Sequence, residues 1–284
     1  MKVAVTGASG FIGRHVVRRL SLLPGVHVVA VSRRGAGAWL PEGVAHVAAD
    51  MSAASEGAFE WLGRPDALIH LAWSGLPNYQ SRHHFDTHLG EQYRFLEQLV
   101  KAGLSTLVCA GTCFEYGMQS GELDESLPTD PCNPYGFAKD ALRRELEFLA
   151  ADSQVRLTWA RLFYMYGEGQ APGALYTQFM AAAGRGDAEF RMSGGEQLRD
   201  FLPVADVAQH LVALALGHAA HGIVNICSGR PTSVRSLVEG WRDSLGSPIE
   251  LALGHFPYPS YEPMAFWGSN AKLIRLTREV ADAS

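Results

Sequence analysis

Three glycines at a fixed spacing near the start of the chain constrain its fold more than any other feature. Gly7, Gly10 and Gly13 lie between an apolar run at residues 2–6 and a segment of helical spacing at residues 11–23. Glycines at this spacing let the backbone turn tightly and approach a pyrophosphate, to which the helix N-terminus presents free N–H groups. An ordinary glycine-rich turn is the alternative, but the strand before the loop and the helix after it favour dinucleotide binding.

Apolar runs and helical segments alternate along the first part of the chain. The runs that have the character of buried strands are residues 2–6, 26–31, 44–48, 67–72, 106–110 and 157–161. The segments with helical spacing are residues 11–23, 85–102 and 135–151. Apolar strands that alternate with helices predict an α/β fold, a Rossmann-type doubly wound parallel sheet that helices cover on both faces.

The pattern loosens after Gly167, where glycine and proline become frequent and loops separate the helical segments at residues 175–184 and 233–245. We therefore expect an NAD(P)-binding Rossmann domain at residues 1–166. Residues 167–284 are expected to form mainly a smaller C-terminal substrate-binding region that closes over the carboxyl edge of the sheet. Within them, residues 203–228 have the pattern of a helix and a strand that rejoin the first domain.

The composition excludes several other classes of protein. The 284 residues are 47% hydrophobic and 19% charged, as in a globular chain that buries a core without disulfides. The net charge is −5 and no Lys/Arg block stands out beyond Arg33-Arg34, so we expect no nucleic-acid partner and no membrane partner. No apolar run approaches the ~18 residues of a membrane span, and the N-terminal run is too short for a signal peptide. We expect a cytoplasmic protein.

The cysteines and histidines argue against a disulfide framework and against a metal site. The four cysteines, at positions 109, 113, 132 and 227, include no Cys-x-x-Cys pair. Among eleven histidines, His83, His84 and His88 lie close together in sequence. Adjacent helical residues point to different faces, and no H-x-x-x-H pair carries the glutamate of a zinc motif. We therefore expect no bound metal.

The residues after the second predicted strand bear on which nicotinamide cofactor binds. An acidic side chain there accepts hydrogen bonds from a ribose 2′-OH, whereas an arginine receives a 2′-phosphate. This chain has Ser32-Arg33-Arg34 and no acid. Ser32 can hydrogen-bond a phosphate and either arginine can pair with it, although a solvated surface pair is the alternative. The segment favours NADP(H) and leaves NAD(H) possible.

Two segments carry candidate catalytic groups. Tyr135 and Lys139 are four residues apart, so on a helix both side chains lie on one face. A neighbouring ammonium favours the phenolate, so the tyrosine can exchange a proton with a substrate hydroxyl or carbonyl. Thr112 follows the strand at residues 106–110, at the edge where open α/β sheets bind ligands. Alone, each pattern also fits a surface lysine or a turn-stabilising threonine.

Seven motifs in order along nearly the whole chain resemble the extended short-chain dehydrogenases/reductases of the NAD-dependent epimerase/dehydratase family. They are Thr6-Gly-Ala-Ser-Gly-Phe-Ile-Gly13, His70-Leu-Ala72, Thr112 with Tyr116-Gly117, Pro134-Tyr-Gly-Phe-Ala-Lys139, Arg161-Leu-Phe-Tyr-Met-Tyr-Gly-Glu-Gly-Gln170, Arg199-Asp-Phe-Leu-Pro-Val-Ala-Asp-Val207 and Asn225-Ile-Cys-Ser-Gly229. Any one motif is modest, but their order together is highly specific.

The resemblance implies a role for each matched residue. Thr112, Tyr135 and Lys139 match the Ser/Thr–Tyr–Lys triad, with Tyr135 as acid/base and Lys139 also on the nicotinamide ribose. The expected cofactor contacts are Gly7, Ser9, Gly10, Phe11, Ile12, Gly13, Ser32, Arg33, Arg34, Asp50, Met51, Leu71, Ala72, Trp73, Ala110, Tyr135, Lys139 and Phe163. The expected substrate contacts are Ser74, Thr112, Phe114, Tyr164 and Arg199, with Arg199 on the diphosphate.

The chain also departs from the family pattern. Dehydratases of the family carry an Asp-Glu pair directly after the triad threonine, and this chain has Cys113-Phe114. Glu115 is offset from that pair and is expected to be structural or to face solvent. Tyr164 and Thr87 stand where the family often has asparagine. The acid–base pair that removes water from C5 and C6 of a sugar is therefore missing.

The segment from Trp73 to Gly117 most resembles reductases of nucleotide-linked 4-keto-6-deoxyhexoses, of the type that forms dTDP-fucose. The predicted reaction is NADPH-dependent reduction of the C4 keto group of dTDP-4-keto-6-deoxyglucose. A C4 epimerase that keeps NAD bound is the alternative enzyme, and a non-catalytic NAD(P)-binding regulator is the alternative of another class. The resemblance also implies a homodimer, formed through the helices at residues 85–102 and 135–151.

Overall fold

Seven parallel strands form the central sheet in a computed structural model that describes residues 1–51, 56–217, 219–258 and 261–282. Their order across the sheet is β12-β7-β5-β4-β1-β2-β3. The bounds are β1 Lys2–Thr6, β2 His27–Ser32, β3 Ala45–Ala48, β4 Ala67–His70, β5 Thr106–Thr112, β7 Arg156–Leu162 and β12 Gly222–Ile226. The order changes direction between β1 and β4, which confirms the predicted doubly wound α/β fold.

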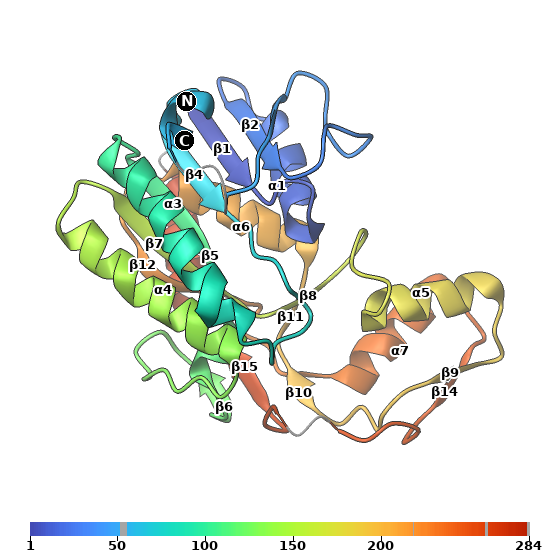
Figure 1. The fold of residues 1–284 in the computed structure, drawn as a ribbon. Helices are drawn as coiled ribbons and strands as arrows, with labels where there is room; N and C mark the ends of the chain where they lie inside the picture. The colour runs from blue at the N-terminus through green and yellow to red at the C-terminus, as the bar shows by residue number, and fades with distance from the viewer. Residues whose placement is uncertain (52–55, 218, 259–260, 283–284) are drawn as a thin grey trace.

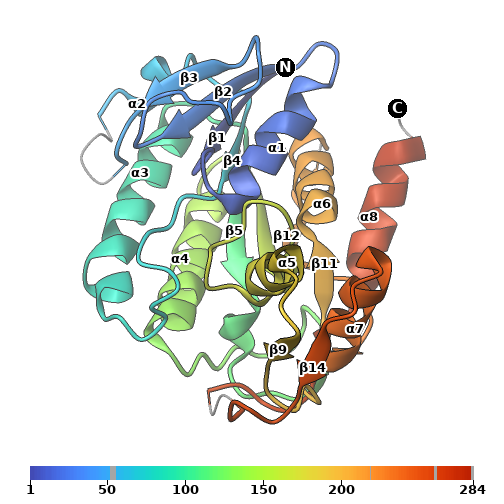
Figure 2. The same cartoon turned by 90° about the vertical axis from the view of Figure 1, so that its right-hand side faces the viewer.

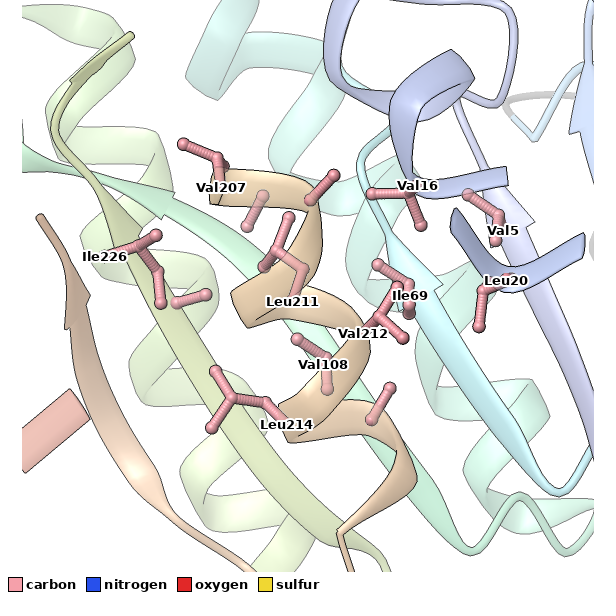
Figure 3. Close-up of a cluster of buried hydrophobic side chains, with 14 of the residues drawn as sticks. Val5, Val16, Leu20, Ile69, Val108, Val207, Leu211, Val212, Leu214 and Ile226 are labelled. Atoms are coloured by element: carbon pink, nitrogen blue, oxygen red, sulfur yellow. The ribbon is translucent and has the colours of Figure 1, made fainter. Parts of the chain in front are cut away.

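Helices cover both faces of this sheet (Figure 2). One face carries α1 Phe11–Ser21, α6 Val204–Leu216 and α8 Ala271–Asp282, and the other carries α2 Ala58–Trp61, α3 Leu89–Lys101 and α4 Pro134–Ala151. The strands read as continuous apolar runs because both of their faces are buried. Val5 and Ile69 pack toward α1 and α6 (Figure 3). On the opposite face, Ala4 and Leu68 belong to the cluster that includes Phe95 of α3 and Leu142 of α4.

Strand β12 comes from the second half of the chain but pairs in parallel with β7, with Val224 opposite Ala160. Helix α6, which precedes it, contributes Leu211 and Val212 to the same core as β1 and β4 (Figure 3). Both elements therefore belong to the sheet layer rather than to the rest of the C-terminal half.

A smaller lobe extends from the carboxyl edge of the sheet (Figure 1). It contains α5 Leu175–Arg185, β9 Glu189–Arg191, α7 Val234–Leu245 and β14 Glu250–Ala252. Phe179, Val238 and Trp241 are buried in its own core. Three short strand pairs complete the assignment: β6 Gly121–Leu123 with β15 Phe266–Gly268, β8 Tyr164–Tyr166 with β11 Phe201–Pro203, and β10 Leu198–Arg199 with β13 Thr232–Ser233.

Three local details differ from the sequence-based ranges. Strand β4 ends at His70, so the two residues that follow it lie in the next loop. Strand β5 continues to Thr112 and is followed by the 3₁₀ turn η2, Cys113–Tyr116. The helix expected at residues 85–102 begins with a π-helical turn, η1 His84–His88, before α3. None of the helices described is long and apolar enough to cross a membrane.

Candidate active site

The loop between β1 and α1 requires its glycines. Gly7 has φ +67°, and a Cβ placed on it would lie 2.9 Å from the backbone of Leu71 and Ala72. A Cβ on Gly13 would lie 2.2 Å from the carbonyl oxygen of Gly7. Gly10 caps α1 without a side chain, and the first turn of α1 carries no acidic residue. The N-terminus of α1 is thus open to an anion, and the loop fits the pyrophosphate of a dinucleotide.

This loop forms one wall of a cavity of about 400 Å³, which we call the glycine-loop cavity. It is lined by Gly7, Ser9, Gly10, Ser32, Arg33, Asp50, Met51, Leu71, Ala72, Trp73, Ser74, His83, His88, Glu91 and Gln92. The first ten of these were predicted to contact the cofactor, and they lie at or beyond the carboxyl ends of β1, β2, β3 and β4. Ser74, which was predicted to contact the substrate, lines this cavity as well.

The two candidate phosphate-binding arginines differ in their placement. Arg33 lines the glycine-loop cavity, whereas Arg34 is exposed and lies outside that lining. The Ser32 hydroxyl donates to the Arg34 carbonyl at 2.6 Å and lies 2.9 Å from Nε2 of His46. Ser32 and His46 therefore hold the start of the Arg33 segment in place.

A second cavity, of about 270 Å³, lies beside Tyr135, and we call it the tyrosine cavity. It is lined by Phe11, Ile12, Leu76, Tyr79, Gly111, Thr112, Cys113, Phe114, Tyr135, Leu162, Phe163, Tyr164, Met165 and Gln170. It brings together two of the three predicted catalytic residues, Thr112 and Tyr135, with the predicted substrate residues Phe114 and Tyr164. Phe11, Ile12 and Phe163, which were predicted to contact the cofactor, are part of the same wall.

Tyr135 is held at the start of α4 by local and distant contacts. The Asn133 side chain caps the helix by accepting from the Gly136 N–H at 2.8 Å, and Pro134 occupies the first turn. The Tyr135 N–H donates to the Tyr79 carbonyl at 3.2 Å. Burial raises the pKa of the Tyr135 phenol, although a hydrogen bond with the Thr112 side chain acts in the opposite direction. Burial therefore favours the neutral phenol, the form that can donate a proton in the predicted role of acid.

Lys139 lies one turn further along α4 and is buried. Its ammonium donates to the carbonyl oxygen of Ala110 at 2.8 Å and lies 4.0 Å from the centre of a Trp73 ring. Burial lowers its pKa to about 8, although Cys109 and Glu115 raise it. Lys139 is thus not a surface lysine, and it is packed behind Trp73 rather than among the residues that line either cavity.

Thr112 is fixed by a reciprocal cap at the end of β5. Its hydroxyl accepts from the Phe114 N–H at 3.3 Å, while its own N–H donates to Glu115 Oε1 at 2.8 Å. The Glu115 carboxylate also accepts from Trp159 at 2.9 Å and from Arg161 Nε at 2.6 Å. Glu115 is therefore a fully buried structural group, and the alternative that it faces solvent is wrong.

Arg199 is buried, lines neither cavity and is already paired. Its Nη2 lies 2.8 Å from Glu262, and its Nη1 donates to the carbonyls of Leu198 and Met264. The Tyr164 hydroxyl donates to the same Glu262 carboxylate. A diphosphate that binds Arg199 would have to replace Glu262. Glu262 is 63 residues away in sequence and belongs to none of the seven motifs.

Several residues around the tyrosine were not singled out as site residues. Tyr79 and His84 have ring centres 5.6 Å and 5.3 Å from that of Tyr135. His84 accepts from the Trp73 indole N–H at 3.0 Å and donates to the Asn78 carbonyl at 2.8 Å, so both of its nitrogens are engaged. Within the described ranges, no group of three or more His, Cys, Asp or Glu residues is placed to hold a metal ion.

The fold and the site together define a dinucleotide-dependent enzyme. The parallel sheet has a glycine-rich loop after its first strand, and a tyrosine, a lysine and a threonine lie at its carboxyl edge. The chain belongs to the NAD dependent epimerase/dehydratase family, whose sequence model matches residues 3–227. It is an enzyme of this nucleotide-sugar family, as predicted from the seven motifs.

Two curated relatives and one solved structure illustrate the range of this family. The dTDP-6-deoxy-L-talose 4-dehydrogenase (NAD(+)) of Aggregatibacter actinomycetemcomitans is 31% identical over 278 residues, which cover 95% of this chain and 100% of the relative. The UDP-glucose 4-epimerase of Streptomyces lividans is 28% identical over 272 residues, covering 87% and 82%. The structure of MoeE5 in complex with UDP-glucuronic acid and NAD is 29% identical with a TM-score of 0.82, covering 98% of this chain and 93% of MoeE5.

Proposed function

We propose that this chain reduces the C4 keto group of a nucleotide-linked 4-keto-6-deoxyhexose, with dTDP-4-keto-6-deoxyglucose as the favoured substrate and NADPH as the reductant. The observation that carries the proposal is the neutral phenol of Tyr135 in the wall of the tyrosine cavity, beside Thr112. Similarity to an enzyme that acts at C4 of a dTDP-6-deoxyhexose supports the choice of substrate class. The smaller lobe, within residues 167–284, is proposed to bind the nucleotide sugar.

The chain's own residues supply the acid and its support. When bound, the reduced nicotinamide supplies the hydride to C4. Tyr135 donates its phenolic proton to the carbonyl oxygen, which becomes the new hydroxyl. The Thr112 hydroxyl accepts from the Phe114 N–H, while Glu115 holds the Thr112 backbone N–H, and this hydroxyl hydrogen-bonds the same oxygen. The buried ammonium of Lys139 stabilises the negative charge left on Tyr135.

A C4 epimerase is the second candidate, favoured by the similarity to the UDP-glucose 4-epimerase. The two candidates differ in stoichiometry, because a reductase consumes one NADPH for each sugar and an epimerase returns the hydride to the same carbon. The decisive experiment mixes the protein with dTDP-4-keto-6-deoxyglucose and NADPH, and separately with dTDP-6-deoxy-L-talose and NADP⁺ or NAD⁺, which tests oxidation at C4 in the L-sugar series. Stoichiometric loss of NADPH supports the reductase.

The other outcomes assign the alternatives. Interconversion of UDP- or dTDP-hexoses at C4 without net NADPH consumption would identify an epimerase. Tight dinucleotide binding with no turnover of any sugar in the panel would favour a non-catalytic regulator. A preference between the two sugars would identify the sugar series, which similarity alone does not determine.

We expect Arg33 to create a preference for NADPH over NADH. A charge-assisted contact with the 2′-phosphate should give about a tenfold to hundredfold ratio of Kd values. Arg33→Ala should remove the preference, and Arg34→Ala should keep it, because only Arg33 lines the cavity. Fluorescence titration with both reduced cofactors measures the ratio. Equal affinities in the unmodified protein would show that Arg33 is a surface charge.

The activity should also fall as the pH rises past about 8. Burial places the pKa of Lys139 at about 8, so its ammonium is present below that pH and is lost above it. The pKa of Tyr135 is raised, so the phenol stays neutral throughout this range. A pH profile of kcat/KM should decline by about tenfold per unit on the alkaline side. Lys139→Arg should move this decline to higher pH, and a wild-type profile that stays flat to about pH 10 would contradict the role.

We also propose a homodimer. Phe137 and Phe148 of α4 are 51% and 75% exposed, and the ring of Phe137 lies 5.9 Å from that of Phe85. Large exposed aromatic side chains on one helix are typical of a surface that a second protein covers. Sedimentation equilibrium of the wild type and of Phe148→Ser tests the assignment, and a wild-type monomer would refute it.

A further inference from the structure

Three side chains outside the proposed catalytic triad form a hydrogen-bonded chain in the wall of the glycine-loop cavity. The Ser74 hydroxyl hydrogen-bonds Nε2 of His88, and Nδ1 of His88 lies 3.2 Å from a carboxylate oxygen of Glu91. All three residues line the cavity. The side chains of His88 and Glu91 are only 10% and 17% exposed, so their geometry is sheltered from bulk water.

The chemistry of these groups determines what Ser74 offers to a ligand. An ionised carboxylate only accepts hydrogen bonds, so Nδ1 of His88 carries the hydrogen. In the neutral imidazole, Nε2 is then an acceptor, and the Ser74 hydroxyl must donate to it. The hydrogen of Ser74 is thereby occupied, and its oxygen presents only lone pairs to the cavity. Ser74 can accept from a hydroxyl or an amide N–H, but it has nothing to donate to a phosphate or a carboxylate.

The strand order places Ser74 on one side of the glycine loop. Arg33 and Asp50 follow β2 and β3, whereas Ser74 follows β4. Strand β1, which carries the glycine loop, lies between β4 and β2 (Figure 1). A dinucleotide whose pyrophosphate lies on the loop, and whose adenosine lies toward Arg33 and Asp50, therefore extends its other nucleotide toward Ser74.

The residues near Ser74 also indicate that the nicotinamide-side nucleotide lies there. Trp73 lies 4.0 Å from the Lys139 ammonium, and its ring centre is 6.0 Å from that of Tyr135. His84 lies nearby, but both of its nitrogens are engaged by Trp73 and Asn78, so it has no free position with which to orient Ser74. His88 is thus the imidazole that sets the direction of the Ser74 hydroxyl.

We propose that Ser74 is a binding residue for the dinucleotide, and that its oxygen accepts a hydrogen bond from a hydroxyl of the pentose on the nicotinamide side. His88 and Glu91 are positioning residues, because they act on the ligand through Ser74. This inference rests on dinucleotide binding and not on the sugar reaction. Its failure is therefore distinguishable from failure of the proposed reductase.

The first test compares ADP with ADP-ribose, which differ by that pentose. Their Kd values are measured by competition against the fluorescence of bound NADPH. Ser74→Ala should raise the Kd of ADP-ribose by about 2- to 12-fold, the range for one lost neutral hydrogen bond, and leave the Kd of ADP unchanged. An equal loss of affinity for ADP and ADP-ribose, or no loss of affinity for either, would overturn the proposal.

The second test asks whether Ser74 and His88 act as a unit. His88→Phe should raise the Kd of ADP-ribose by a factor similar to that of Ser74→Ala. The Kd of the double variant should be no higher than that of either single variant. Glu97→Gln is the matched control on α3, because Glu97 pairs with Lys101 and lies outside the cavity lining. Losses that multiply in the double variant would show that His88 does not act through Ser74. Ser74→Ala removes a single oxygen, so the ligand comparison remains decisive even if the His88 variant unfolds.

Discussion

Replacing Tyr135 with phenylalanine is expected to lower kcat for the 4-keto sugar by about 100- to 10,000-fold, the range that general acid catalysis contributes. The substitution removes the phenolic proton that the developing alkoxide requires and leaves the ring in place. The Kd of NADPH should stay near the wild-type value, because Tyr135 lines the tyrosine cavity and not the glycine-loop cavity. Single-turnover rates and fluorescence titration measure the two quantities separately.

The matched control for this prediction is Tyr79→Phe. Tyr79 lines the same cavity, its ring centre is 5.6 Å from that of Tyr135, and burial raises the pKa of its phenol to about 12. If Tyr79 only contacts the sugar, losing its hydroxyl should cost about tenfold or less. Equal losses in the two variants would mean that the cavity does not distinguish one proton donor. A Tyr135→Phe enzyme with the wild-type rate would refute the mechanism.

The parts of the site that the sequence predicted are those with local causes. The glycine loop was identifiable because Gly7 needs a positive φ and Gly13 has no room for a Cβ. Tyr135 and Lys139 were identifiable because four residues on a helix make one turn, and Asn133 and Pro134 mark where that helix begins. In each case the conformation depends on residues that are close in sequence, so the spacing of those residues is enough to predict it.

The parts that the sequence did not predict depend on contacts between distant segments. Burial, which no local pattern reports, raises the pKa of Tyr135 and lowers the pKa of Lys139. Arg199 was expected to be available to a diphosphate, but Glu262 reaches it from a loop near the C-terminus. The direction in which the loop after β4 folds placed Ser74 in the glycine-loop cavity. These features follow from packing, which a spacing between residues does not encode.

The largest expected effect on stability comes from Arg161. Its Nε lies 2.6 Å from Glu115, and the side chains of the pair are 1% and 0% exposed. Removing one partner of a buried ion pair leaves an uncompensated charge, which costs about 3 to 5 kcal/mol. Arg161→Met should therefore lower the free energy of unfolding by about this amount, a large share of the ~5 to 15 kcal/mol of a typical domain. Urea denaturation followed by circular dichroism measures the change.

Two further variants test whether the stability loss comes from the buried charge rather than from the removal of an arginine as such. Arg64→Met removes the partner of Glu60 from a pair that is 70% and 61% exposed, so the urea midpoint should hardly move. Adding Glu115→Gln to Arg161→Met removes the stranded buried charge and should restore part of the stability. If Arg161→Met lowered the free energy of unfolding no more than Arg64→Met does, the buried pair between Arg161 and Glu115 would not stabilise the fold.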